Sequence, residues 1–312
     1  SIEATYKYSC ENNVQLMLIA SKSQVDWNGG YVNDWNTQQY TEYLGKMVKK
    51  HPMSDVLICR DHCGAGFNSN VRFDNPRKDL ADAIKTIEYD LEYGFDLIHV
   101  DMCHLRADHD GKLKWSAKIL DLIKKINPAT LIELGTDECS GNAAVDLVQL
   151  ERDIKFFSEW KPTFYVSQTG TLIKEINQVG TFEPEIVGKT ADLLHRNGFK
   201  LKEHNADYLS INDLKLRKGI VDAMNIAPML GVLQTSFILH KSMQYGFDTT
   251  AFLDRSYASG RWKKWLYKNE MSNKYLCALC AGHYNFTSDE YRRLFDRINA
   301  VEEGGLYNLI VN

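Results

Sequence analysis

A regular alternation of short apolar runs with longer amphipathic segments is the feature that most restricts how this 312-residue chain can fold. Apolar runs of strand length recur at 16–20, 56–58, 97–100, 130–134, 164–166, 200–202 and 221–226. Segments of helical period lie between them, at 37–50, 80–91, 117–126, 145–160 and 186–197. In one of these, Leu80, Ala83, Ile84 and Ile87 have the i, i+3, i+4, i+7 spacing of a helix that packs on a sheet. Strand–helix–strand units at this spacing favour a parallel sheet with helices outside it.

Seven such strands, with an eighth implied, predict an α/β fold of the (β/α)8 TIM-barrel type. A doubly wound sheet is the alternative, but no Gly-x-Gly-x-x-Gly motif follows an early strand. Segment 1–12 has helical spacing, so the first barrel strand is expected upstream of residue 1. A seven-stranded barrel would leave two unpaired edges. We therefore predict that the natural polypeptide is longer at its N-terminus, or that the barrel is closed in another way.

The alternation stops at about residue 245. Segment 255–296 is rich in aromatic and charged residues and predicts helices that cap one end of the barrel. We therefore expect two domains, a barrel at 1–245 and a C-terminal helical extension at 246–312 that packs on it.

Composition restricts the compartment and the partners. The net charge is −4, which leaves no basic surface for nucleic acid or an anionic membrane. No apolar run approaches the roughly 20 residues of a membrane-spanning helix. Seven scattered cysteines are more typical of a reducing cytoplasm than of a disulfide framework. We expect a cytoplasmic protein with neither nucleic-acid nor membrane partners.

Polar residues stand where the predicted strands end. The active sites of barrels lie at the C-terminal ends of the strands. The residues found there include Asp61, His62, Asp101, Glu133, Gln168, Gly170, His204 and Asn225. Converging imidazole, carboxylate and amide groups are what a divalent metal ion requires. Structural alternatives exist: Glu133 could form a buried salt bridge, Gln168 could cap a backbone, and Asp101 could organise a loop.

Three of these segments resemble class II fructose- and tagatose-bisphosphate aldolases. They are Asp61-His62-Cys63, Ile132-Glu133-Leu134-Gly135 and Met224-Asn225-Ile226. Further segments resemble, in order, the accessory subunits of tagatose-bisphosphate aldolase: 20–25, Gly29-Gly30-Tyr31, 98–101, 203–208 and Trp262-Lys263-Lys264. The likeness covers most of the chain up to about residue 265.

The resemblance implies a role for each residue. Asp61 would be the catalytic acid/base, and His62, Glu133, Gln168 and His204 would be the metal ligands. Substrate contacts are expected from Ser21, Gln24, Gly30, Asp101, Gly170 and Asn225. Catalytic class II aldolases have a histidine where this chain has Gln168, and an amide oxygen donates more weakly than imidazole. Zinc is the expected ion, with manganese, magnesium or cobalt as alternatives.

These residues suit carbon–carbon cleavage or epimerisation. Such a reaction leaves negative charge on an enolate oxygen, and a carboxylate must move the proton of the hydroxyl on the breaking bond. Adjacent residues of a strand point oppositely, so Asp61 and His62 can both face the site only if the strand ends there and the backbone turns. Amides near Gly30 and Gly170, or cations in 255–264, could bind a phosphate.

Two functions remain open at this point. The first is a metal-dependent aldolase or epimerase acting on a phosphorylated ketose or a related sugar. The second is a non-catalytic subunit that stabilises a tagatose-bisphosphate aldolase, which is the role implied by the accessory family. We expect a homo-oligomer, with a catalytic aldolase subunit as a further partner in the second case.

Overall fold

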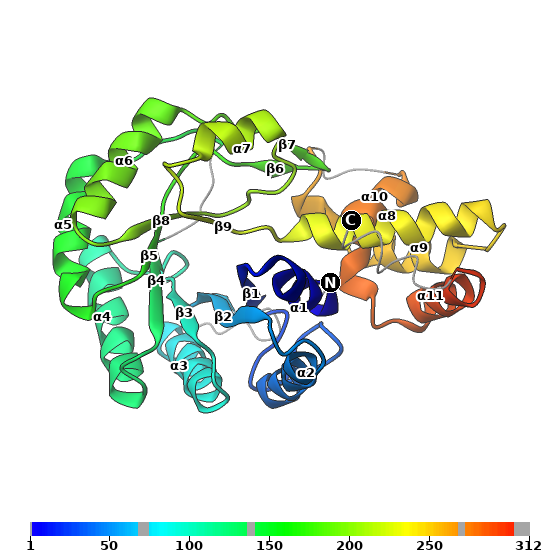
Figure 1. Cartoon of the computed structure of the whole chain (residues 1–312), viewed down its shortest axis with the longest axis horizontal. Coiled ribbons are helices and arrows are strands. Elements are labelled where there is room, and N and C mark those ends of the chain that lie inside the picture. The colour runs from blue at the N-terminus through cyan, green and yellow to red at the C-terminus, as the bar shows by residue number, and fades with distance from the viewer. Residues whose placement is uncertain (1, 68–74, 136–140, 268–271, 303–312) are drawn as a thin grey trace.

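The computed structural model describes residues 2–67, 75–135, 141–267 and 272–302. Its main element is a parallel sheet of seven strands that curls around its own inner face (Figure 1). The strands, in spatial order, are β1 (Gln15–Ser21), β2 (Asp55–Cys63), β3 (Leu97–Val100), β4 (Leu131–Gly135), β5 (Phe164–Val166), β8 (Lys200–Glu203) and β9 (Ala223–Met224). Because all strands are parallel, their C-terminal ends meet along one rim.

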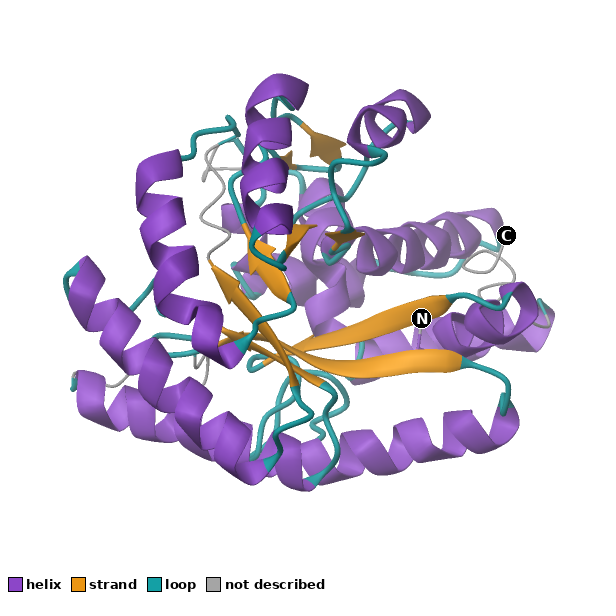
Figure 2. Ribbon diagram, turned by 60° about the vertical axis from the view of Figure 1, so that its left-hand side comes forward, coloured by secondary structure: helices purple, strands orange, loops and turns teal. Residues whose placement is uncertain are grey.

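Helices cover the outer face of this sheet (Figures 1 and 2). They are α1 (Ile2–Asn12), α2 (Thr37–Lys50), α3 (Pro76–Glu92), α4 (His109–Ile126), α5 (Leu147–Phe157) with the 3-10 turn η1 (Ser158–Trp160), α6 (Pro184–Arg196) and α7 (Ile211–Arg217). Local signals set their starts, such as the capping box of Asn36 and Gln39 before α2. Their apolar stripes pack on outward-facing strand residues such as Ile98, Ile132 and Leu201, which form the main core.

The inner face changes character along the strands. Near the start of the strands it is apolar, with Leu57, Cys59, Leu97, Leu131 and Phe164 in one small cluster. Two residues further along β2, β3 and β4 the same face carries Asp61, His99 and Glu133. The period-two alternation of strands therefore directs these polar groups inward above an apolar floor.

The remaining elements lie beyond the C-terminal rim or after β9. A short antiparallel pair, β6 (Ile173–Lys174) and β7 (Asn177–Gln178), lies between β5 and α6. After β9 come α8 (Pro228–Gln244), α9 (Thr250–Ala258), the 3-10 turn η2 (Arg261–Lys264), α10 (Lys274–Ala281), the 3-10 turn η3 (Gly282–Asn285) and α11 (Asp289–Val301). A second core cluster includes Ile238 of α8, Phe252 of α9 and Leu294 of α11. The predicted boundary at 245/246 stays a prediction, and residues 303–312 lie outside the described part.

The predicted α/β class, the parallel sheet, its outer helices and the helix at the start of the chain are confirmed. The predicted end of the second strand is wrong, because β2 continues to Cys63 and includes Asp61 and His62. In the described residues, β1 and β9 stand at opposite ends of the strand order and do not pair. The complete eight-stranded barrel, with a first strand upstream of residue 1, stays a prediction.

Candidate metal centre

A β-bulge in β2 directs two adjacent side chains to the inner face. Arg60 pairs with Ile98 and Cys63 pairs with Val100, so Asp61 and His62 together oppose the single residue His99. His62 accommodates the extra residue with a left-handed backbone, at φ 42°. The sequence predicted that the backbone turns at the end of this strand, but the structure has a bulge within the strand instead. The bulge allows both Asp61 and His62 to face the site.

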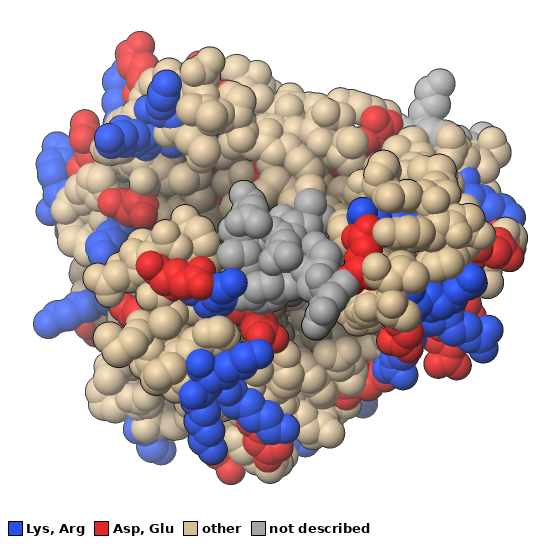
Figure 3. Space-filling view, turned by 45° about the vertical axis from the view of Figure 1, so that its right-hand side comes forward, with Lys and Arg blue, Asp and Glu red and all other residues tan. Residues whose placement is uncertain are grey.

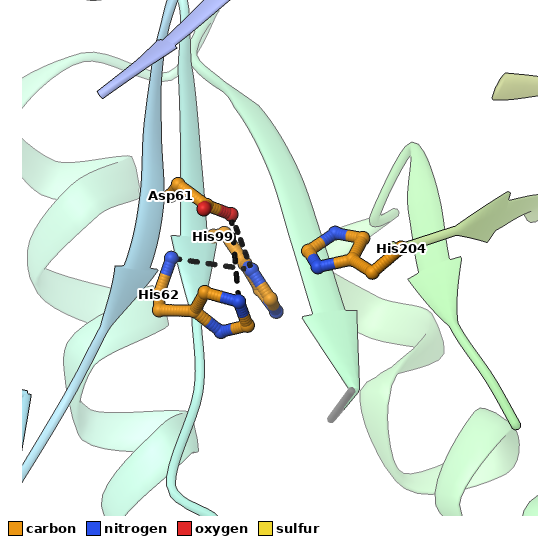
Figure 4. Close-up of side chains that lie close together, drawn as sticks. All are labelled: Asp61, His62, His99 and His204. Carbon is orange, nitrogen blue, oxygen red and sulfur yellow. Dashed lines mark hydrogen bonds and ion pairs between the residues drawn. The ribbon is translucent and has the colours of Figure 1, made fainter. Parts of the chain in front are cut away.

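Four potential ligand residues converge at this point (Figure 4). Asp61, His62, His99 and His204 each offer one ligand atom, and these atoms all lie within 4.8 Å of one another. His99 and His204 are buried, whereas the side chains of Asp61 and His62 keep 15% and 14% of their accessible surface. The two buried imidazoles form the floor of the site, and Asp61 and His62 are the groups a small molecule can reach.

Each imidazole has a hydrogen-bond acceptor at one ring nitrogen. The Nδ1 of His62 lies 2.9 Å from Asp101 Oδ2, and the Nε2 of His99 lies 3.2 Å from the carbonyl oxygen of Gly135. The Nε2 of His204 lies 2.8 Å from Glu133 Oε1. These acceptors favour the tautomers that carry the proton on the bonded nitrogen and leave a lone pair on the other. Acceptors behind histidines in this manner are typical of metal sites.

Asp61 carries an unpaired buried oxygen in this group. Its Oδ1 lies 3.7 Å from His62 Nε2 and 3.7 Å from His99 Nδ1, too long for hydrogen bonds. Among the described residues this atom has no hydrogen-bond partner. Burial by itself raises the pKa of Asp61, but the imidazoles of His62, His99 and His204 outweigh it and hold that pKa well below its usual range. Asp61 is therefore an ionised carboxylate beside three imidazoles, with one oxygen that makes no hydrogen bond among the described residues, as expected of a cation or hydroxyl site.

Glu133, expected as a metal ligand, is engaged with other side chains. It is 1% exposed, its Oε1 faces His204 Nε2, and its Oε2 forms an ion pair with Lys202. Burial opposes ionisation, but His99, His204 and Lys202 lower the pKa of Glu133 to about 2. In this structure Glu133 orients His204. Its ion pair with Lys202 is the buried salt bridge that the sequence left open as the alternative. Whether Glu133 also binds metal stays a prediction.

Two residues expected to contact substrate lie directly behind or beside the histidines. Asp101 is 1% exposed and accepts hydrogen bonds from His62 and from the backbone N–H of Cys103. Burial opposes its ionisation, but His62 and His99 hold the pKa of Asp101 below its usual range. Asn225 is 5% exposed, and its Nδ2 lies 2.9 Å from His204 Nε2. Because His204 Nε2 carries its proton toward Glu133, it cannot accept a hydrogen bond from the Asn225 amide nitrogen. The amide group is therefore better turned so that its oxygen faces His204 Nε2.

The other expected substrate residues lie along the rim. Ser21 ends β1 beside Asp61, and its backbone N–H donates to Gln24 Oε1 at 2.8 Å. The N–H of Gly30 donates to the carbonyl of Trp35, so that amide is used within its own loop. A Cβ on Gly170 would lie 1.9 Å from the carbonyl oxygen of Thr181, so this glycine is required for a close backbone approach. Gln168 is half-buried and follows β5 at the same rim.

Sequence reasoning missed His99. The run 97–100 is buried throughout and is apolar except for His99, whereas the other candidate residues stand at or after strand ends. The signal was present in the period of two, because His99 shares a face with Leu97 and stands opposite Glu133 in the pairing of β3 with β4.

The donor set fits a divalent cation. The three imidazoles match the nitrogen ligands of zinc, and also suit manganese or cobalt. His62, His99 and His204 would hold such an ion, with Asp61 at its side. The identity of the metal stays a prediction.

Solved structures with a similar fold are known, although the sequence itself matches no protein-family model and no curated protein. Among solved structures, a probable tagatose 6 phosphate kinase from Sinorhizobium meliloti 1021 superimposes with a TM-score of 0.79 at 15% identity, covering 97% of this chain and 85% of that one. A fructose-bisphosphate aldolase from Campylobacter jejuni gives a TM-score of 0.56 at 14% identity, with coverages of 96% and 87%.

The chain shares its fold with both of these proteins. The relation to class II aldolases predicted from the sequence is thus confirmed at the level of the fold. A fructuronate-tagaturonate epimerase from Cohnella laeviribosi is also similar, with a TM-score of 0.56 at 11% identity over 85% of this chain and 68% of that one. These identities are low, so the comparisons describe architecture, and the argument for activity depends on the site.

The surface adds two observations. On the face drawn in Figure 3, lysine and arginine side chains lie interspersed with aspartate and glutamate side chains. Among the described residues, no helix combines the length and apolar character that a membrane crossing requires. The expected absence of nucleic-acid and membrane partners, and the cytoplasmic location, stay predictions.

Proposed function

We propose that this protein is a metal-dependent enzyme of the class II aldolase type. It would cleave, form or epimerise a phosphorylated ketose or a related sugar. One observation carries the proposal: three histidines, each with an acceptor behind one ring nitrogen, converge with the carboxylate of Asp61 at the C-terminal rim of a parallel sheet. The similarity in fold to fructose-bisphosphate aldolase and to fructuronate-tagaturonate epimerase supports this class of reaction.

Asp61 is the group that we assign to proton transfer. It is ionised, partly accessible and without a hydrogen-bond partner at Oδ1, so it can accept the proton of a substrate hydroxyl and return it. A divalent cation held by the histidines would act as a Lewis acid on the carbonyl and adjacent hydroxyl oxygens of the sugar. Asp101 and Glu133 orient His62 and His204, and the buried His99 excludes water from the floor of the site.

Metal loading is the direct test of the site. Purified protein should bind one divalent ion, and His62→Ala and His99→Ala should each lose most of it because a ligand is removed. His109→Ala is the matched control, since His109 Nε2 also lies 2.8 Å from a carboxylate, that of Asp153, but His109 is outside the group of four potential ligands. Equal metal content in the His99→Ala and His109→Ala variants would exclude His99 as a ligand.

Asp61→Asn separates catalysis from metal binding. The amide keeps the shape of the side chain but cannot accept a proton, so turnover of a ketose phosphate should fall by about 10²–10⁴-fold. Metal content and thermal stability should stay close to those of wild type. Turnover is measured over a panel of ketose phosphates, as release of a triose phosphate or as epimerisation. Unchanged turnover in this variant would remove Asp61 from the mechanism.

A non-catalytic accessory role is the second candidate. Gln168 stands where catalytic class II aldolases have a histidine, and the sequence resembles the accessory subunits over most of its length. An accessory subunit would turn over no sugar phosphate alone, and its Asp61→Asn variant would support a partner aldolase as well as wild type does. Assays of both proteins, alone and with a tagatose-bisphosphate aldolase, distinguish the two roles.

A further inference from the structure

The 3-10 turn η2 concentrates positive charge that the described residues do not balance. Arg261, Lys263 and Lys264 are all exposed and follow one another within one turn, interrupted only by the buried Trp262. No carboxylate of the described residues forms an ion pair with any of the three, although nearby surface lysines such as Lys274 do form such pairs. The turn therefore presents several positive charges to solvent without a carboxylate counter-ion in the part of the chain that the structure describes.

Each of these cations lies over an aromatic ring, and Arg261 and Lys264 each contact two rings. The guanidinium carbon of Arg261 lies 5.3 Å from the ring centre of Tyr31 and 4.7 Å from that of Tyr284. The Nζ of Lys264 lies 4.4 Å from the ring centre of Trp265 and 5.5 Å from that of Tyr284. Such cation–π contacts orient the side chains without using their N–H groups, which stay available for hydrogen bonds to an anion.

This turn connects the loops that follow the two ends of the curled sheet. Tyr31 lies in the loop after β1, and its N–H donates to the carbonyl of Ser23, close to the residue that pairs with Asp61. Tyr284 follows His283, which packs directly against Gly231 in the first turn of α8, just after β9. The cations thus lie beside segments that follow the C-terminal ends of β1 and β9.

Two buried polar atoms of the same segment also lack partners. Among the described residues, Trp265 Nε1 and His283 Nδ1 have no hydrogen-bond partner. Burial, with the positive charges of Lys264 and Arg261, lowers the pKa of His283 to about 3. The excess positive potential of the turn therefore extends to neighbouring side chains.

We propose that Arg261 and Lys264 bind the phosphate group of the sugar whose carbonyl end lies at Asp61. A planar guanidinium fork beside an ammonium group matches the several oxygens of a phosphate dianion, and the net charge of the turn balances it. This inference rests on the proposed function for the identity of the substrate. The anion site itself is independent of metal binding and of catalysis.

Binding of inorganic phosphate to metal-free wild-type protein tests the site without any turnover. Titration calorimetry should detect binding at millimolar phosphate, and Arg261→Gln and Lys264→Gln should each weaken it by at least about tenfold, because a charge-assisted hydrogen bond is lost. Two matched controls remove the same charge from a cation–π contact elsewhere. They are Arg297→Gln and Lys118→Gln. In the wild type, the Arg297 guanidinium carbon lies 3.9 Å from the centre of the Phe247 ring, and Lys118 Nζ lies 4.1 Å from the centre of the Trp115 ring.

Equal affinity in the η2 variants and the controls, or no phosphate binding by the wild type, would overturn the proposal. Arg261→Lys keeps the charge but loses the planar fork, so it should retain intermediate affinity if the protein is folded. Failure of the proposed function has a different signature: phosphate would still bind through Arg261 and Lys264, while metal loading and turnover would be absent.

Discussion

At the scale of single residues, the site depends on how each histidine is held. The bulge at Asp61 and His62 directs both side chains inward, and the left-handed backbone of His62 is the local cost of that arrangement. Behind the imidazoles, Asp101, Glu133 and the carbonyl of Gly135 each accept a hydrogen bond. A ligand set of this kind has its tautomers chosen before an ion arrives, which reduces the free energy needed to organise it.

Asp101→Asn tests this pre-organisation. The amide can present its NH₂ group to His62 Nδ1 and favour the wrong tautomer, with the proton on the nitrogen that faces the site. Metal affinity should fall by about 10–100-fold while the ligands themselves remain. Competition with a chromogenic chelator measures the affinity. Asp153→Asn, which alters the equivalent partner of His109, should leave it unchanged. An Asp101→Asn protein with wild-type affinity would show that the contact has no orienting role.

At the scale of elements, buried charges connect strands that are not neighbours in the sheet. Lys202 of β8 pairs with Glu133 of β4 across β5, and both side chains are 1% exposed. On the outer side, Arg60 of β2 forms two hydrogen bonds, each of 2.6 Å, to Asp90 of α3. Such pairs contribute little net stability compared with apolar contacts, but each is costly to break from one side.

Lys202→Met should therefore destabilise the fold strongly. It leaves the Glu133 carboxylate buried without its cation, which is expected to lower the free energy of unfolding by about 3–5 kcal/mol. The matched control is Lys200→Met on the same strand. Lys200 is exposed, and its Nζ lies 5.9 Å from the Phe164 ring, which the Lys202 Nζ approaches to 5.5 Å. Denaturant titration compares the two variants. Similar losses in both would mean that the aromatic contact, and not the ion pair, is the relevant interaction.

At the scale of the whole molecule, the C-terminal segment contacts loops at the C-terminal rim of the sheet. The turns η2 and η3 carry Arg261 and Tyr284 to the loop after β1, and the N–H of Glu175, beside β6, donates to the carbonyl of Trp265 at 2.7 Å. His283 is packed into this junction against α8. The stability of the junction is therefore part of the stability of the whole fold.

The low pKa of His283 predicts a measurable acid sensitivity. Its pKa is about 3 in the folded chain and about 6.5 when unfolded, so the full contribution to stability is present above about pH 6.5. As the pH falls, the unfolded chain binds a proton that the folded chain does not, and stability is lost. Between about pH 7.5 and pH 5 the loss amounts to about 2 kcal/mol. His283→Gln should lack it, which denaturant titration of both proteins at each pH can measure. Parallel pH profiles in the two proteins would contradict this account.

The sequence by itself determined the class of the fold and most of the candidate site. Hydrophobic periodicity is a local property, so strands such as 97–100 and 164–166 and the helix at 37–50 could be assigned at their observed limits. Asp61, His62 and His204 could be found because they stand at or just after strand ends.

What only the tertiary structure decided depends on pairing between distant segments. The bulge is defined by the register of β2 against β3, and His99 became a candidate ligand only when β3 was set beside it. The ion pair of Glu133 with Lys202 joins residues that are far apart in the chain. The same is true of the contacts of Arg261 with Tyr31 and Tyr284. No local pattern encodes such contacts, because they form only when the curled sheet and its C-terminal helices assemble.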